Sequence, residues 1–326
     1  MINILKMYLF ITAFCLAQTA QAEYDPLLKG ESGEYITQEL NVCYGAADRE
    51  IPVLVYRPEN AEARRPAILF SHGLGGSRYG CEYLGRHWAG AGFVCFFLQH
   101  PGSDSSIWED LPAGERLKAF NQAANGKNYM HRINDVRAVL DFIEKKAKQK
   151  HDSLGKIIDP NSIGMSGHSF GAVTTQAVSG LSAWNGRKVY SDDRIRAAIA
   201  LSPSVPKNSS ADEAFGSVNR PWMLMTGTKD QSIIGTASPE ERLKVYEALP
   251  AGDKYQIVLH NGKHLAFTDR QPRKWGKRNP NHHTIIKAAS TAFWDSYLKN
   301  DPQAKEWLDG DKIAAILEPK DKWQKK

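Results

Sequence analysis

From residue 66 onward, short apolar runs alternate with longer amphipathic stretches, and this alternation limits the folds open to the chain. The apolar runs read "PAILFSHG", "FVCFFLQH", "SIGMSG", "IRAAIALSP", "PWMLMTG" and "YQIVLH". The stretches between them include "MHRINDVRAVLDFIEKKAKQ" and "HTIIKAASTAFWDSYLK", with apolar residues at helical spacing. Strands that are apolar on both faces and alternate with helices are typical of a mostly parallel sheet covered on each side. The sequence therefore predicts an α/β fold with helices on both faces of a mostly parallel central sheet.

Two features refine this prediction. The segment "EYITQELNVCYGAADREIPVLVYRP" alternates like two strands around turn residues Gly45–Asp48, which indicates an N-terminal antiparallel strand pair. Two longer excursions, Pro101–Asn128 and Pro203–Arg220, each follow a predicted strand. Ligand sites in such sheets form at the carboxyl ends of strands. Because neither excursion is long enough for a large cap domain, we expect a fairly open site.

The N-terminus has the pattern of an export signal. Lys6 precedes an apolar stretch at residues 7–17, and the small residues Ala20 and Ala22 follow it. A positive charge, a short apolar core and an A-x-A site are typical of a secretory signal peptide. This apolar stretch is shorter than the roughly 20 residues that span a bilayer. An uncleaved anchor is the alternative to a cleaved signal peptide. We expect a signal peptide at 1–22, cleaved after Ala22, and a single domain at 23–326 without a transmembrane segment. The mature protein would be exported, to the periplasm or the medium.

Charge and cysteine content exclude some partners. The formal net charge of +6 is mild for 326 residues, and the basic residues are scattered except in the tail "EPKDKWQKK". We interpret that tail as a solvated end, and no basic stripe interleaved with aromatic residues indicates nucleic-acid binding. Cys95 lies in an apolar run and is predicted to be buried, which leaves Cys43 and Cys81 as the more plausible disulfide pair. The cysteine spacing fits no zinc site, and no metal or organic cofactor is implied.

A candidate nucleophile lies between a predicted strand and a predicted helix. The segment "GHSFG" satisfies G-x-S-x-G, with the apolar run "SIGMS" before it and "AVTTQAV" after it. A sharp turn in that context places the middle residue, Ser169, in a strained conformation, and Gly167 and Gly171 leave room for neighbouring backbone. An ordinary strand-to-helix connection that contains two glycines is the alternative. The context favours Ser169 as a nucleophile.

A serine nucleophile needs a base to take its proton, and the base needs an orienting acid. In this fold the base follows the last strand. There "NGKHLAF" provides His264 on a loop, whereas His260 continues the strand itself. His282 and His283, which open the last predicted helix, are interpreted as solvated first-turn residues.

The acid should follow the preceding strand. The segment "PWMLMTGTKDQS" ends that strand and provides Asp230. Asp253 and Glu240 are nearby in sequence, but a loop and a polar helical face suit surface roles better. We therefore expect Asp230 to hold the imidazole of His264 in the productive tautomer.

Acyl transfer also requires donors for the oxyanion. The backbone N–H of Phe170, which follows the nucleophile, is one candidate. The glycine-rich segment "FSHGLGGS" after an early strand provides the other, from Leu74, with a plain glycine-rich turn as the alternative. Trp108, in the loop "HPGSDSSIWEDL", is a candidate for part of the substrate pocket, and a core or surface role is as plausible for it.

These motifs resemble the α/β-hydrolase superfamily, specifically the dienelactone-hydrolase-like esterases, with features of the platelet-activating-factor acetylhydrolases. The similar segments run in the family's order over residues 66 to about 308: "SHGLGGSR", "QHPGSD", "RINDVRAVLD", "GHSFGA", "GTKDQS", "NGKHLAF" and "TAFWDSYLKNDPQAKEWL". Position by position, the resemblance implies Ser169 as nucleophile, Asp230 as acid and His264 as base. It implies Leu74 and Phe170 as the oxyanion donors.

The chain departs from the family at two positions. Dienelactone hydrolases proper use a cysteine nucleophile where this chain has Ser169, so their substrate is not carried over. Ala172 stands where many relatives have another glycine, which affects packing more than chemistry.

Together these features predict an exported serine hydrolase that cleaves carboxylic esters through an acyl-enzyme intermediate. The substrate would be a small-molecule or lipid-like ester. The same machinery would also serve a lipase, a polyester hydrolase, an amidase or an acyltransferase. A catalytically silent binding protein on this scaffold is the alternative from a different class. The oligomeric state is not predicted.

Overall fold

The computed structural model describes residues 23–326 except 46–48, 184–185, 236 and 271–277. The predicted signal peptide at 1–22 therefore lies outside the described residues. No helix among the described residues is long and apolar enough to cross a membrane.

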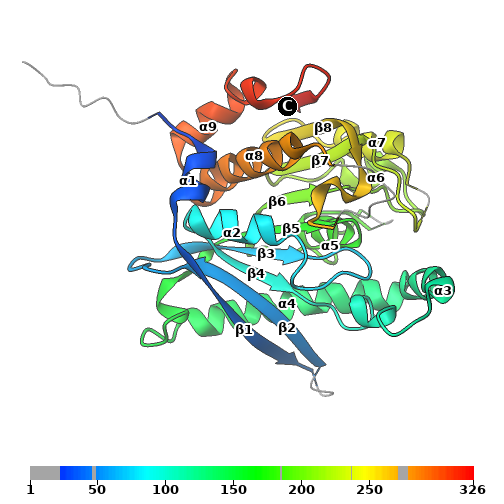
Figure 1. Ribbon diagram of the computed structural model, residues 1–326, viewed down its shortest axis with the longest axis horizontal. Coiled ribbons are helices and arrows are strands. Elements are labelled where there is room, and N and C mark those ends of the chain that lie inside the picture. Colours follow the sequence, from blue (N-terminus) through cyan, green and yellow to red (C-terminus); the bar gives the residue numbers. More distant parts are fainter. Residues whose placement is uncertain (1–22, 46–48, 184–185, 236, 271–277) are drawn as a thin grey trace, which may run out of the picture.

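A nine-stranded sheet runs through the molecule in the order β1-β2-β4-β3-β5-β6-β7-β8-β9 (Figure 1). The strands from β3 to β8 pair in parallel, whereas β1, β2 and β9 pair antiparallel with their neighbours. The strand bounds are β1 Tyr35–Tyr44, β2 Arg49–Pro58, β3 Arg65–Ser71, β4 Val94–Leu98, β5 Ile158–His168, β6 Ile195–Leu201, β7 Trp222–Lys229, β8 Lys254–Lys263 and β9 Lys322–Lys325. The predicted α/β architecture, with its N-terminal antiparallel pair, is confirmed.

Helices cover both faces of the sheet. One face carries α1 Pro26–Ser32, α2 Glu82–Gly90, α8 Pro280–Leu298 and α9 Pro302–Asp309. The other carries α4 Gly126–Ala147, α5 Phe170–Ser179, α6 Ala211–Phe215 and α7 Pro239–Ala248. Alternate residues of one strand enter the two cores: Trp222 and Leu224 pack towards α6 and α7, and Met223 and Met225 pack towards α8. This two-sided burial explains why the parallel strands are continuous apolar runs.

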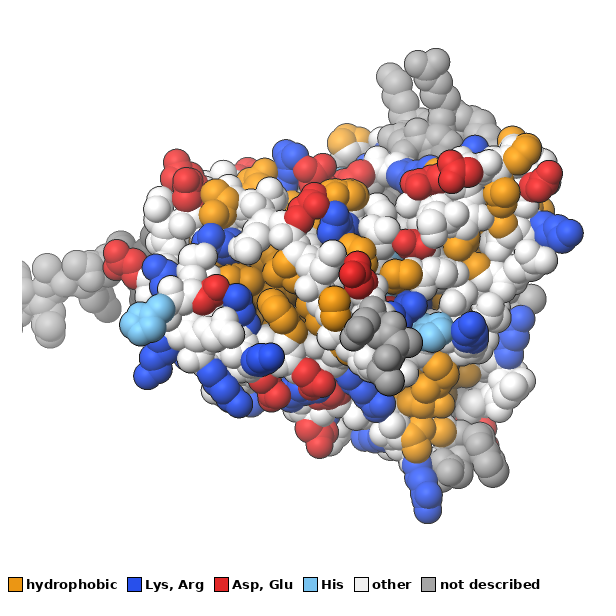
Figure 2. All heavy atoms as spheres, turned by 90° about the horizontal axis from the view of Figure 1, so that it is seen from below, with side chains coloured by type: hydrophobic (Ala, Val, Ile, Leu, Met, Phe, Trp, Pro, Cys, Tyr) orange, Lys and Arg blue, Asp and Glu red, His pale blue; other side chains and the backbone are white. Residues whose placement is uncertain are grey.

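The two excursions contain short helices. Ala113–Ala123 forms α3 within the first, and α6 lies within the second. On the face seen in Figure 2, acidic and basic side chains are interspersed around groups of hydrophobic ones. The described residues on this face therefore form neither a large acidic patch nor a large basic patch.

The predicted disulfide is wrong, because Cys43, Cys81 and Cys95 are all free. Cys43 is exposed near the end of the edge strand β1. Cys81 is buried just before α2, where its thiol donates to the carbonyl of Phe267 at 3.3 Å. One thiol is thus exposed and the other is buried, and the two do not pair. Cys95, as expected, is buried in β4.

The C-terminal tail is not a solvated end, which corrects its interpretation from charge alone. Residues Lys322–Lys325 form β9, which pairs antiparallel with β8. Trp323 stacks on Tyr255 with ring centroids 5.4 Å apart, and Asp321 accepts a hydrogen bond from the N–H of His260 at 2.6 Å. The basic side chains remain outside while the single aromatic residue attaches the tail to the sheet.

Substituting Trp323 by alanine should therefore destabilise the protein. Loss of a half-buried aromatic contact is expected to lower the free energy of unfolding by about 1–2 kcal/mol. Urea unfolding followed by circular dichroism measures this, with the exposed Lys322→Ala in the same strand as the control. Equal stability of the two variants would contradict a docked tail.

Candidate active site

Ser169 lies in a strained turn that close backbone packing imposes. It joins β5 to α5 with φ 57° and ψ −114°, a combination that few residues other than glycine adopt. A Cβ atom on Gly171 would lie 1.8 Å from the carbonyl oxygen of Ser71, the last residue of β3. A Cβ on Gly167 would lie 2.4 Å from the carbonyl oxygen of Gly171. Both glycines are therefore required by the close approach of the turn to the neighbouring strand.

Three predicted residues form one hydrogen-bonded chain. Ser169 Oγ lies 2.9 Å from His264 Nε2, and His264 Nδ1 lies 2.6 Å from Asp230 Oδ1. Asp230 directly follows β7, and His264 begins a 3₁₀ helix at His264–Phe267, directly after β8. All three therefore meet at the carboxyl edge of the parallel strands, although they are up to 95 residues apart in sequence.

Asp230 is held as a buried carboxylate. Its Oδ2 accepts a hydrogen bond from the hydroxyl of Thr226 at 2.9 Å, and Arg242 Nε lies 3.3 Å from Oδ1. Burial disfavours its charged form, but the hydrogen bond from His264 and the positive charge of Arg242 outweigh this and lower the pKa of Asp230 to about 2. The carboxylate therefore stays ionised at neutral pH. It is suited to stabilise a positive charge on the imidazole.

The rival residues have other partners. His260 donates its N–H to Asp321 and accepts at its carbonyl from His282 Nε2 at 3.2 Å, away from Ser169. Asp253 pairs with Lys305, and Glu240 is exposed on α7.

The expectation that His282 and His283 are solvated is wrong. His282 is buried and bonded to β8, and the ring of His283 stacks on Tyr83 with centroids 3.7 Å apart. The side chains of His282 and His283 therefore pack against β8 and α2 rather than facing water. Burial lowers the pKa of His283 to about 4, so this ring is neutral at neutral pH.

His168, the second residue of the G-x-S-x-G motif, was not singled out by sequence reasoning. Its Nε2 lies 2.9 Å from the carbonyl oxygen of His264, and the two rings are 4.8 Å apart. Burial, together with the nearby His264, lowers the pKa of His168 to about 3. A neutral His168 donates Nε2–H to that carbonyl and so fixes the loop that carries His264. Its place beside Ser169 was the only sequence signal for this contact.

The two predicted oxyanion donors flank Ser169. Phe170 is the first residue of α5, so its N–H has no partner within the helix. The N–H of Leu74 donates to no other described residue, whereas the next N–H, of Gly75, donates to the carbonyl of Ser103 at 2.9 Å. A Cβ on Gly73 would lie 3.4 Å from Ser169 Cβ, so this loop lies against Ser169.

Two cavities open on either side of Ser169. One, of about 400 Å³, is lined by Phe170, Val173, Val205 and Ile234 among others. The second, of about 370 Å³, is lined by His264 and Trp108, by residues of the glycine-rich segment and by residues of the segment that follows His264. Leu74 and Ser169 line both cavities.

Trp108 belongs to the pocket wall. Its Nε1–H donates to the carbonyl of Gly75 at 2.8 Å, and its ring packs against Phe120. The guanidinium groups of Arg116 and Arg270 each lie 5.0 Å from the centre of the ring. Trp108 therefore links the glycine-rich loop to the first excursion while it lines the second cavity.

The strained backbone of Ser169 makes a testable prediction about stability. Glycine adopts this conformation freely, so Ser169→Gly should be more stable than Ser169→Ala by about 1 kcal/mol. At Ser166, which lies in β5, the order should reverse, because glycine in a regular strand costs conformational entropy. Urea unfolding of the four variants measures both differences, and an alanine variant more stable at both positions would refute the strain.

Comparisons with known proteins support a hydrolase. No protein-family model matches the chain. A platelet-activating factor acetylhydrolase from Cavia porcellus is 23% identical over 323 residues, which cover 86% of this chain and 68% of the relative. Similarity at this distance supports a hydrolase family at a coarse level.

Proposed function

We propose that this protein is a serine esterase that cleaves carboxylic esters through an acyl-enzyme intermediate. The proposal rests on the hydrogen-bonded chain Ser169–His264–Asp230, in which Ser169 occupies a strained turn and lines two cavities. The hydrolase relative supports the reaction class. The signal-like segment at 1–22 supports export as part of the same proposal.

The proposed reaction has two acyl-transfer steps. Ser169 Oγ attacks the ester carbonyl while His264 Nε2 takes its proton, and the imidazolium gains stability from Asp230. The N–H groups of Leu74 and Phe170 bind the negative oxygen of the tetrahedral intermediate. Each such donor is typically worth about 2.7–4 kcal/mol of transition-state stabilisation. His264 then protonates the departing alcohol, and a water that it activates releases the acid.

The position of His264 also orients the substrate. The alcohol leaves with a proton from His264, so the leaving group must lie in the cavity that His264 lines. The acyl chain then points into the other cavity, whose wall includes Val173, Val205 and Ile234. At about 400 Å³, this cavity is by itself as large as a small-molecule site. Its volume is far larger than the volume of an acetyl group. We infer a preference for esters with acyl chains longer than acetyl.

The nucleophile is tested with p-nitrophenyl esters of increasing acyl length. The Ser169→Ala variant should lose about 10³-fold or more in kcat/KM, because the acyl-enzyme can no longer form. Ser166→Ala, in the strand before it, is the control and should keep its activity. Undiminished turnover by the Ser169→Ala variant would overturn the assignment. Labelling of Ser169 by a fluorophosphonate without ester turnover would point to a different acyl substrate.

The substrate orientation is tested at Val173. This residue is half-buried one helical turn after Ser169, whose carbonyl accepts from its N–H at 3.1 Å. A Val173→Trp variant should keep acetyl ester turnover but lose roughly tenfold or more in kcat/KM for octanoyl esters, because the larger ring fills the acyl cavity.

The control for this test is Ser105→Phe, which narrows the other cavity. It should leave the acyl-length profile of p-nitrophenyl esters unchanged. An unaltered acyl-length profile in the Val173→Trp variant would show that the acyl chain does not occupy this cavity. A shifted profile in the Ser105→Phe control would show that the acyl chain occupies the other cavity instead.

A further inference from the structure

We propose that Arg132 is a positioning residue that holds both halves of the oxyanion hole and places a buried positive charge behind it. This inference rests on the proposed function, because it assigns Arg132 a role in the same acyl-transfer reaction.

Arg132 lies on α4 and is fully buried. Its Nη1 donates to the carbonyl oxygen of His72 at 2.6 Å, and its Nε donates to Ser103 Oγ at 2.9 Å. Both partners belong to the segments that support the glycine-rich loop, since the carbonyl of Ser103 also accepts from the N–H of Gly75. One side chain therefore fixes the loop two residues before Leu74 and, through Ser103, one residue after it.

The same guanidinium also contacts the other half of the site. Its central carbon lies 4.4 Å from the centre of the Phe170 ring, close enough for a cation–π interaction. Leu74, on the glycine-rich loop, and Phe170, at the start of α5, are almost 100 residues apart in sequence. Arg132 touches the flank of one and the side chain of the other, so it sets their relative position.

The charge of Arg132 is not cancelled by a direct partner. Burial lowers its pKa to about 9, so it is still cationic at neutral pH. Among the described residues, Arg132 forms no ion pair with a carboxylate. The nearby Asp135 is instead bonded to Arg49 and His100, and Asp104 is bonded to Gln99 and Ser106. Because its hydrogen-bond acceptors are neutral, the positive electrostatic potential of Arg132 is not neutralised by a directly bonded anion. This potential favours negative charge on the neighbouring oxyanion.

A second serine–histidine–aspartate chain forms the base of this arrangement. Ser71 Oγ lies 2.8 Å from His100 Nε2, and His100 Nδ1 lies 2.9 Å from Asp135 Oδ2. All three side chains are fully buried, and neither Ser71 nor His100 lines the two cavities beside Ser169. No substrate reaches this serine. The chain instead orients the end of β3, from which the oxyanion loop departs.

His72 completes the attachment of the loop. Its Nε2 accepts from the N–H of His100 at 3.0 Å, so its proton lies on Nδ1, which donates to the carbonyl of Gly73 at 2.6 Å. Burial, with Arg132 nearby, holds the pKa of His72 well below its usual value. A neutral His72 can make both bonds at once, and within this turn the N–H of Leu74 donates to no other described residue.

This arrangement predicts an effect on the transition state rather than on substrate binding. The Arg132→Met variant should lose roughly tenfold or more in kcat, less than the 10²–10³-fold typical of a deleted direct donor, with KM nearly unchanged. The affinity for a boronic acid, which forms an anionic tetrahedral adduct with a serine nucleophile, should fall by a similar factor. The Arg132→Lys variant, which keeps the charge but loses the fork, should recover part of both losses.

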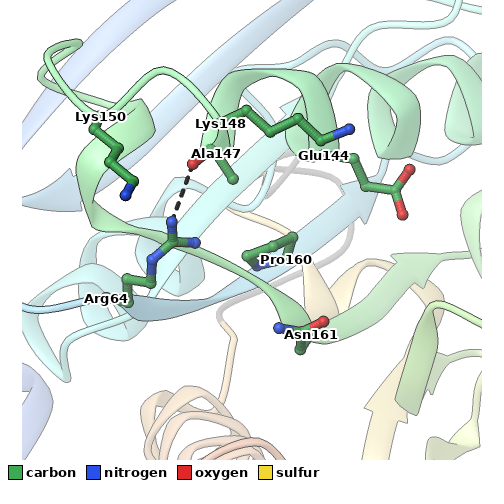
Figure 3. Close-up of a pocket in the computed structure, with 7 residues that line it drawn as sticks. All are labelled: Arg64, Glu144, Ala147, Lys148, Lys150, Pro160 and Asn161. Atoms are coloured by element: carbon green, nitrogen blue, oxygen red, sulfur yellow. Dashed lines mark hydrogen bonds between the residues drawn. The ribbon is translucent and has the colours of Figure 1, made fainter.

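Arg64 offers a matched control at the opposite end of β3. It precedes that strand and donates to the carbonyl of Ala147 at 3.0 Å (Figure 3). It also donates to the carbonyl of Ile158 at 2.9 Å. Arg64→Met thus removes two hydrogen bonds to backbone carbonyls, far from Ser169. It should lower the thermal midpoint while kcat and boronic acid affinity stay at the wild-type level.

The outcomes separate the inference from the proposed function. A folded Arg132→Met variant with wild-type kcat and boronic acid affinity would overturn the role of Arg132. If that variant does not fold, Arg132→Lys and the milder Ser103→Ala, which removes one acceptor, decide: wild-type kcat in both would overturn it equally. Boronic acid binding that persists in Ser169→Ala would instead refute the proposed nucleophile, whatever the arginine variants show.

Discussion

The contact on which the site depends is the packing of Gly171 against the carbonyl of Ser71. Nothing larger than hydrogen fits between them, because a Cβ atom would lie 1.8 Å from that oxygen. The contact draws the start of α5 onto the end of β3, so the turn of Ser169 and the glycine-rich loop meet although they belong to different strands. The strain at Ser169 is the cost of this approach. The geometry of both candidate oxyanion donors follows from it.

Two serine–histidine–aspartate chains lie within this region, and access to solvent distinguishes them. Ser169 lines two cavities, whereas Ser71 is fully buried. Both chains place an imidazole between a hydroxyl and a carboxylate, and a neutral imidazole ring accepts at one nitrogen and donates at the other. The same bonding pattern would thus serve the proposed acyl transfer at one place and loop placement at another. The pattern alone does not assign a function.

Much of the fold could be predicted from local patterns, and so could the residues that meet at the site. Two-sided burial makes parallel strands apolar throughout, and the order of loops along the chain restricts which residues reach one edge of the sheet. Ser169, Asp230 and His264 were found in this way. Features that depend on distance between remote segments could not be found. One such feature is that Cys43 and Cys81 form no disulfide, because one is exposed and the other is buried. Another is that Trp323 packs on Tyr255 although its neighbours in sequence are charged. Arg132 sits in an amphipathic helix like any surface arginine, and only the packing of α4 shows that it is buried.

The buried charges around the site have an order that suits the proposed reaction. Burial keeps His72 and His168 neutral, whereas Arg242 beside Asp230 and Arg132 beside the glycine-rich loop carry positive charge. When a serine attacks an ester, positive charge develops on the base and negative charge on the carbonyl oxygen. The first would then face Asp230 and the second would face Arg132. Each developing charge would meet an opposite charge already fixed in place, so little reorganisation would be needed during the reaction.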